Sequence, residues 1–195
     1  NDAHKLELTA AIFGFNDPAG TLLAFRGWGI GDAKVGAFSQ LPLPPLPNIG
    51  LDSEFLPQPF WVEPIAEVDN RPGYYLALDY SYGNNFKAGA FYYDNRGDPE
   101  QRKDLQYAWD TRFWNFYLEG DLGAGLKVIG QYMVGKTEMG FLYGPSQLRL
   151  VDIDYDAAFV LATKNLGKYR ITARFDWYGV DDNSFLAWDD NRESG

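Results

Sequence analysis

Three aspartates at alternate positions give the sequence its clearest arrangement for holding a metal ion. Asp152, Asp154 and Asp156 lie in the stretch DIDYD, which resembles the start of a helix-flanked calcium loop. The rest of that loop is missing, because Ala157 stands where glycine is required and Thr163 where a glutamate is expected. Three carboxylates on one face of a strand are still a candidate for a divalent cation, and a hydrated acidic rim is the alternative. Apart from this candidate we expect no metal site and no cofactor.

Residues suited to catalysis are few. The single histidine is His4 and no GxSxG motif occurs, so a Ser-His-Asp triad would depend on His4 alone. Glu119 and Asp121 form a carboxylate pair of the kind used in glycoside hydrolysis. These two share one strand face beside a turn, where hydration explains them better. We therefore expect no enzyme.

Charged residues also recur opposite apolar residues in stretches that alternate with a period of two. The stretch KYRITARFDWYGVDD begins at Lys168 and alternates apolar or aromatic residues with polar ones. Successive side chains of a β-strand point to opposite faces of the sheet, so this pattern predicts one apolar face and one polar face. We assign to the polar face the charged residues Arg26, Arg112, Arg170, Arg174, Lys127, Glu7, Asp79, Glu119 and Asp176.

About eight such stretches, each about ten residues long, predict an all-β protein without a convincing helix. Strands of soluble proteins usually have about five or six residues, whereas about ten residues cross a bilayer when the strand is tilted. The predicted strands cover residues 5–15, 21–31, 74–83, 85–95, 111–121, 126–137, 155–164 and 168–182.

The connections between these strands alternate in length. NDPAG, GNN, DLGAG and NLGK are short and have the composition of hairpin turns. The other connections are long, at 32–73, 96–110 and 138–154, and the tail from 180 to 195 is similar. The loop 32–73 contains LPLPPLP, which we interpret as a stiff segment of a long loop. Whether this loop folds into the lumen, with Phe55, Phe60 and Trp61 as packing anchors, stays open at this point.

Composition excludes several other classes of protein. The formal net charge of -10 argues against binding to nucleic acid, which requires a basic surface. The chain has no cysteine, which excludes a disulfide framework or a cysteine-based metal site. It has no apolar run of about 18 residues, so a transmembrane helix is not expected either.

Strand length, loop asymmetry and the rings near strand ends favour a barrel in a membrane. Backbone N–H and C=O groups in hydrocarbon must pair within the protein, which leaves helices or closed barrels. We therefore expect an antiparallel up-and-down transmembrane β-barrel whose lumen is lined by the charged residues of the polar face. With the short turns placed in the periplasm, eight strands leave both chain ends on the outer side of the membrane, and the sequence ends in DDNRESG and not on an aromatic residue. We therefore expect residues 1–195 to be one domain, incomplete at both ends, of a barrel of about 16 strands.

Several stretches carry a resemblance to a known family. DYSYGNNFKAGAFYYDN and ATKNLGKYRITARFDWYGVDD resemble hairpins of porin-type barrels of Gram-negative outer membranes. DPAGTLLAFRGW and RPGYYLALDYSYG are similar to segments of uncharacterised porin-like proteins of proteobacteria. The resemblance implies an outer-membrane channel for passive diffusion of small hydrophilic solutes or ions. It also implies contact with membrane lipid. Trimers are common among the porins that the chain resembles, but the sequence leaves open whether it forms a homo-oligomer.

Two other interpretations stay open at this point. A soluble all-β carbohydrate-binding module would show the same alternation, because its strands also have a buried and a hydrated face. A closed barrel of about eight strands would have an interior filled by side chains and would act as an anchor or receptor.

Overall fold

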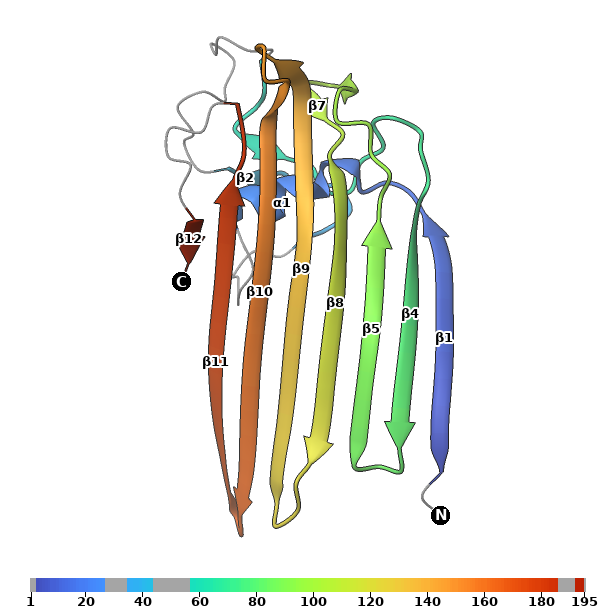
Figure 1. Cartoon of the computed structure of the whole chain (residues 1–195), viewed down its shortest axis with the longest axis vertical. Helices are drawn as coiled ribbons and strands as arrows, with labels where there is room; N and C mark the ends of the chain where they lie inside the picture. The colour runs from blue at the N-terminus through green and yellow to red at the C-terminus, as the bar shows by residue number, and fades with distance from the viewer. Residues whose placement is uncertain (1–2, 27–34, 44–56, 186–191, 195) are drawn as a thin grey trace.

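The protein is built around one antiparallel sheet (Figure 1). The computed structural model describes residues 3–26, 35–43, 57–185 and 192–194. Long neighbouring strands of the sheet are joined in chain order and pair along most of their length. In spatial order the strands are β1 (His4–Phe13), β4 (Gly73–Tyr82), β5 (Phe86–Asp94), β8 (Asp110–Asp121), β9 (Leu126–Tyr143), β10 (Leu148–Leu166), β11 (Tyr169–Asp182) and β12 (Arg192–Ser194).

The sheet is open among the described residues. β1 pairs with β4 and β11 pairs with β10 and β12, but β1 and β11 are not paired with each other. The prediction of an antiparallel β protein is therefore confirmed, whereas the described strands do not close into a barrel.

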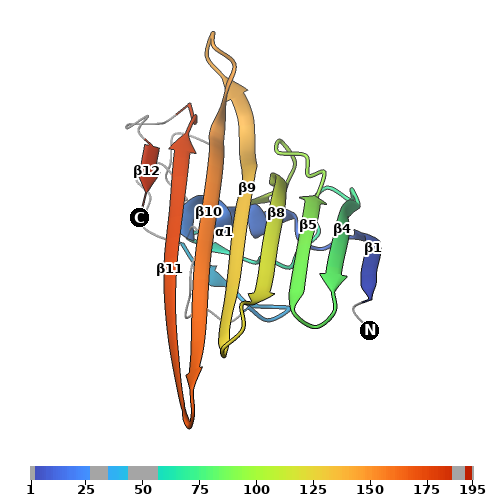
Figure 2. The same ribbon diagram turned by 60° about the horizontal axis from the view of Figure 1, so that its bottom comes forward.

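The two ends of the sheet differ in their connections. The tight turns that follow β4, β8 and β10 lie at the lower end in Figure 1, where β1 also begins. The longer connections, which follow β1 and β5, lie at the upper end. β9 and β10 are 18 and 19 residues long, or about 60 Å at about 3.3 Å per residue. Their hairpin extends beyond the neighbouring strands at the upper end (Figure 2).

The connection between β1 and β4 contains short elements of its own. A 3-10 helix, η1 (Asp17–Ala19), leads into the helix α1 (Gly20–Arg26). Farther along, β2 (Leu41–Pro42) pairs with β3 (Trp61–Val62), and between β5 and β8 the strands β6 (Arg102–Lys103) and β7 (Gln106–Tyr107) form another pair. Neither described helix is long enough or apolar enough to cross a membrane.

The predicted strand at 21–31 is wrong, because its described part is the helix α1. NDPAG is not a hairpin turn, because Pro18 stands in the first turn of η1. A backbone N–H at that position has no hydrogen-bond partner within the helix, so proline, which lacks the N–H, is tolerated there. A short apolar run fits either a strand or a helix, and here tertiary contact decides between them. Leu23 and Phe25 pack against the buried cluster beside the sheet, which stabilises the helical form.

The predicted loop at 138–154 is also wrong, because β9 and β10 continue through most of it. A β-bulge hides these strands from a search for alternation: the pairing register shifts between Arg149 and Val151. Gly140 lies opposite this shift with a φ of 88°, which glycine adopts easily. The extra residue moves every side chain beyond it to the other face, so the period of two is broken.

Candidate functional site

The pairing register sorts the side chains of the sheet onto two faces. Residues directly opposite each other in an antiparallel pair point to the same side. Glu7 faces Asp79, Lys87 faces Glu119, and Leu161 faces Arg174. We call this side the polar face, and toward the lower end of the sheet its residues include Lys5, Glu7, Asp79, Lys87, Tyr117, Glu119, Lys127, Arg170, Arg174 and Asp176.

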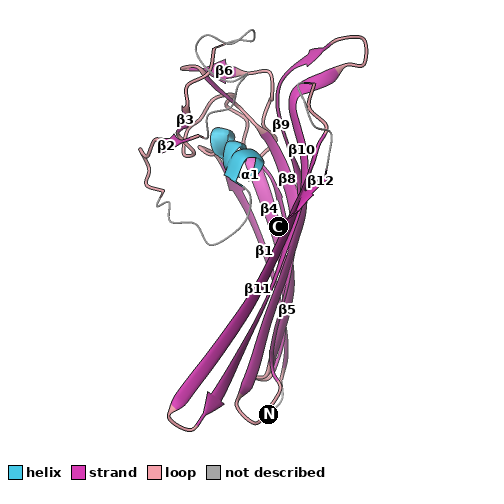
Figure 3. Ribbon diagram, turned by 90° about the vertical axis from the view of Figure 1, so that its left-hand side faces the viewer, coloured by secondary structure: helices cyan, strands magenta, loops and turns pink. Residues whose placement is uncertain are grey.

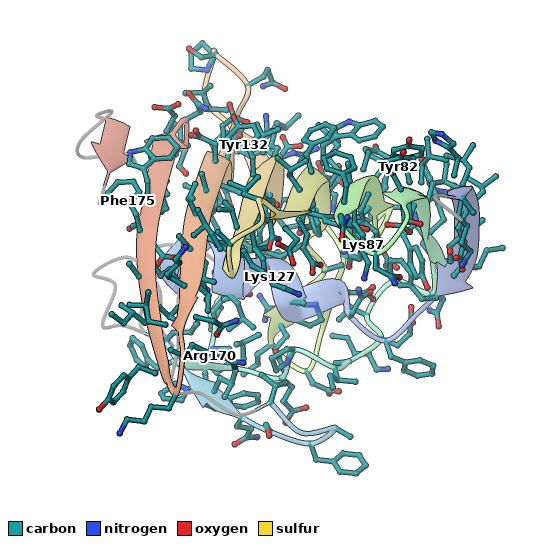
Figure 4. The ribbon with its side chains drawn as sticks, turned by 90° about the horizontal axis from the view of Figure 1, so that it is seen from below. Tyr82, Lys87, Lys127, Tyr132, Arg170 and Phe175 are labelled. Atoms are coloured by element: carbon teal, nitrogen blue, oxygen red, sulfur yellow. The ribbon has the colours of Figure 1, made fainter. Side chains whose placement is uncertain are left out.

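The structure places most of the predicted polar-face charges together. Arg170, Arg174, Lys127, Glu7, Asp79, Glu119 and Asp176 all lie on this face. The sequence prediction did not include Lys87, although it alternates with Phe86 and Ala88 in the same stretch. Figure 4 shows Lys87, Lys127 and Arg170 on the side of the sheet that carries α1.

Arg112 and Arg26 do not belong to this group. Arg112 is two residues from Trp114 and therefore shares its face, opposite Asp94 and Lys136. Assigning it to the polar face was wrong, because Arg112 and Trp114 have the same parity along β8. Arg26 is the last residue of α1 and is not on a sheet strand, and its side chain lies outside the described residues.

Side chains on the polar face pair with one another while staying partly exposed. The Arg174 guanidinium donates to both carboxylate oxygens of Asp176 over 2.6–2.9 Å and lies 4.0 Å from the centre of the Phe159 ring. The Tyr117 hydroxyl donates to Asp79 over 2.6 Å. Exposed ion pairs of this kind contribute only about 0–1 kcal/mol to stability. The lower half of this face is therefore a partly exposed surface of mixed charge.

The upper half of the same face is covered by protein. Figure 3 shows α1, β2 and β3 on this side of the sheet, against its upper part. Phe25 of α1 meets Trp109 edge to face with ring centres 5.7 Å apart. Trp109 belongs to a buried cluster to which β7, β9 and β10 also contribute, and Phe25 packs against this cluster. Its members are Tyr107, Trp109, Met133, Met139, Leu150, Val151, Ile153 and Tyr155.

The described part of the loop 32–73 joins this covering layer, with different anchors from those expected. Phe60 is 50% exposed, so its predicted anchoring role is wrong. Val62 and Leu41 are buried instead, because β2 and β3 pair there. Trp61 is half-buried in the layer, and Phe55 lies outside the described residues.

The opposite side, which we call the apolar face, is uncovered in the described chain. Leu8 is 74% exposed, Ile12 79% and Phe175 69%. Figure 4 shows Tyr82, Tyr132 and Phe175 on this side, away from α1. The register adds aliphatic and aromatic side chains from β1, β4, β8, β9, β10 and β11: Leu6, Leu76, Leu78, Phe116, Leu118, Val134, Val160 and Ile171.

Aromatic rings border the apolar face at two levels. Near the lower end His4 lies 4.8 Å from Tyr82, and Tyr80 lies 6.2 Å from Phe86, measured between ring centres. Nearer the upper end Tyr92 lies 6.0 Å from Tyr74 and 4.8 Å from Trp114. Aliphatic side chains, including Leu8, Leu76 and Leu78, occupy the region between the two levels.

Above the upper rings the apolar face becomes charged. Lys136 contacts Asp152 over 2.9 Å and Glu138 over 3.3 Å, and Arg112 pairs with Asp110 over 2.9 Å. The aspartates at 152, 154 and 156 lie in this band along β10, where alternate residues are about 6.6 Å apart. The structure does not bring them together as a metal site: among the described residues, another group of carboxylates, described below, has the required spacing.

Comparison with known proteins adds no family to these observations. Models of protein families, curated proteins and solved structures give no match to this chain. Its function must therefore be inferred from the two faces of the sheet.

Proposed function

We propose that this chain forms part of the wall of a bacterial outer-membrane β-barrel, through which small hydrophilic solutes or ions diffuse passively. The observation that carries the proposal is that the apolar face of the sheet, and not the polar face, is the one left uncovered. The uncovered face is apolar, and the face that carries the covering layer is polar over its lower half. A soluble sheet would instead direct its apolar face toward protein.

The extent of the apolar face supports lipid as its partner. Exposed apolar patches on soluble monomers rarely exceed a few hundred Å², and larger ones mark a surface that binds protein or membrane. This face runs without interruption from β1 to β11. Lipid matches such a continuous, featureless surface better than a single protein partner does.

The height of the apolar face supports the same partner. On β4 the apolar positions run from Tyr74 to Tyr82, and on β11 from Tyr169 to Trp177. Each run is about 27 Å along the strand at about 3.4 Å per residue. A tilt of about 45° reduces this to about 20 Å, close to the apolar band of about 25 Å on outer-membrane barrels. The rings at both ends of the runs suit the headgroup boundary.

The polar face would then be the wall of the lumen. Its mixture of Arg174, Lys127, Glu119 and Asp79 suits hydrated solutes without a strong preference for one charge. The covering layer on its upper half would narrow the passage and set an upper limit on solute size.

Two measurements test the proposal. Membrane fractionation should place the chain with the outer membrane, with extraction only by detergent and gel mobility that changes on boiling. The purified protein should then increase the conductance of planar lipid bilayers. A chain that stays in the soluble fraction without detergent would refute the proposal and favour the soluble carbohydrate-binding alternative.

A further inference from the structure

Three acidic residues from two distant parts of the β1–β4 connection meet beside the end of β1. Asp17 belongs to η1, and Glu67 and Asp69 lie shortly before β4. One carboxylate oxygen from each residue lies within 4.8 Å of the corresponding oxygens of the other two. A calcium ion holds oxygen ligands at about 2.3–2.6 Å, so two ligands on opposite sides of it are about 5 Å apart. The three oxygens therefore already have the spacing of ligands around one ion.

The buried side chain of Asp17 provides an independent observation that points to a ligand. Its residue is 1% exposed, and its Oδ2 accepts hydrogen bonds from the backbone N–H groups of Val68, at 2.6 Å, and Asp69, at 3.3 Å. Its Oδ1 is buried and has no hydrogen-bond partner among the described residues. Glu67 repeats the pattern, since its Oε1 is buried without a partner while Oε2 accepts from the Phe15 N–H over 3.0 Å.

The charge of the three carboxylates is not balanced by the described side chains. None of the three forms an ion pair in the described part of the chain. Arg71 pairs with Asp98 over 2.6 Å, and Lys103 donates to the backbone carbonyl of Glu67 over 3.1 Å but forms no ion pair with the three carboxylates. Buried negative charge without a partner is strongly unfavourable, so a bound cation would remove a large penalty.

We propose that Asp17, Glu67 and Asp69 bind a divalent cation of the calcium type. The donor set is all oxygen and carries several negative charges, which suits hard cations and not Zn²⁺ or copper. Ca²⁺ takes about six to eight oxygen ligands, so water or backbone carbonyls would complete its coordination beside the three carboxylates.

The bound ion would fasten three segments together. The Asp17 N–H donates to the Ala66 carbonyl over 3.2 Å, and the Trp109 N–H donates to the Asp17 carbonyl over 2.9 Å. Asp69 accepts a hydrogen bond from the backbone N–H of Asp98. The cation would therefore hold η1, the segment before β4 and the segment before β8 in the layer that covers the polar face. The site stands on its own geometry and does not depend on the pore.

Calcium titration of the purified, folded full chain tests the site. The chain is first treated with EDTA, and Ca²⁺ binding is measured by isothermal titration calorimetry and by the shift in thermal unfolding temperature. Asp17→Asn keeps an acceptor for the Val68 N–H and removes the ligand charge. Asp104→Asn is the matched control, because Asp104 is an exposed acid outside the cluster. We expect the wild type and Asp104→Asn to bind Ca²⁺ with a rise in unfolding temperature, and Asp17→Asn to bind at least tenfold more weakly.

A fold defect can be told apart from the loss of a ligand. In EDTA, Asp17→Asn should unfold at or above the wild-type temperature, because the variant removes charge repulsion within the cluster. Glu67→Gln should reproduce the loss of Ca²⁺ affinity if Asp17→Asn does not fold. A wild type without a calcium-dependent shift, or an Asp17→Asn variant that responds as the wild type does, would overturn the proposal.

Discussion

A single charge placed on neighbouring residues of β1 distinguishes lipid from water at the apolar face. Leu8 and Thr9 are adjacent and point to opposite faces, with Leu8 opposite Leu78 and Thr9 opposite Ala77. Both side chains are exposed in the described chain. Leu8→Arg therefore places a charge on the apolar face, and Thr9→Arg places the same charge on the polar face. The pair is matched in strand, depth and the residue introduced.

The expected difference between the two variants follows from their surroundings. If the apolar face is in water, each exposed substitution should change the free energy of unfolding by about 0.5 kcal/mol or less. If that face contacts lipid, arginine near the middle of the bilayer costs about 2–4 kcal/mol, whereas the lumen wall tolerates it. Leu8 lies at the centre of the apolar run from Leu6 to Ile12, so the full penalty should apply. At about 1.4 kcal/mol per tenfold, the folding equilibrium should fall about 30-fold to 1000-fold for Leu8→Arg.

Urea titration of the chain folded in lipid vesicles measures this difference. Tryptophan fluorescence follows unfolding, and the change of gel mobility on boiling gives the folded fraction independently. Ala173→Arg and Thr172→Arg repeat the comparison on β11, where these neighbours also face opposite sides. Equal unfolding midpoints for Leu8→Arg and Thr9→Arg would show that the apolar face is not in lipid and would refute the proposed barrel wall.

Three further outcomes follow from particular contacts. Arg174→Ala should shift the reversal potential in planar bilayers toward cations by leaving a carboxylate unpaired on the polar face, whereas Arg112→Ala should not; equal shifts would contradict the assigned faces. Met139→Ala, at a side chain with no exposure, should lower the free energy of unfolding by about 2–5 kcal/mol in a chemical denaturation curve. Gly140→Ala should lower the free energy of unfolding by at least about 1–3 kcal/mol in the same assay. The reason is that the φ of Gly140 is 88° and a Cβ added there would lie 2.5 Å from the Cβ of Leu150. An unchanged unfolding midpoint would rule out the bulge.

Much of the sheet could be predicted from alternation alone. Alternation is a local property of an extended chain, so Ile171 and Phe175 could be separated from Arg170 and Arg174 without knowledge of their neighbours. The same reasoning assigned Glu7, Asp79 and Glu119 to one face although they come from different strands. The assignment of Arg112 to the polar face was wrong because its position relative to Trp114 along β8 was misjudged: the two residues are two apart and share a face.

Elements that depend on packing could not be found in this way. The run from Gly20 to Arg26 is too short to separate a helical from an extended period, and its contacts with the buried cluster decide for the helix. The bulge at Gly140 reverses the alternation of β9, so the strand beyond it looked like a loop.

The sequence by itself determined which side chains share a face along most of the long strands, because that choice repeats every two residues along one chain. Only the tertiary structure decided that β1 lies beside β4 and that Asp17 meets Glu67 and Asp69. The partners are 60 to 78 positions apart between β1 and β4 and about 50 apart in the carboxylate cluster, and nothing local specifies them. In the described part of the intervening segment, α1 packs across the polar face, where burial of its apolar side chains stabilises the arrangement.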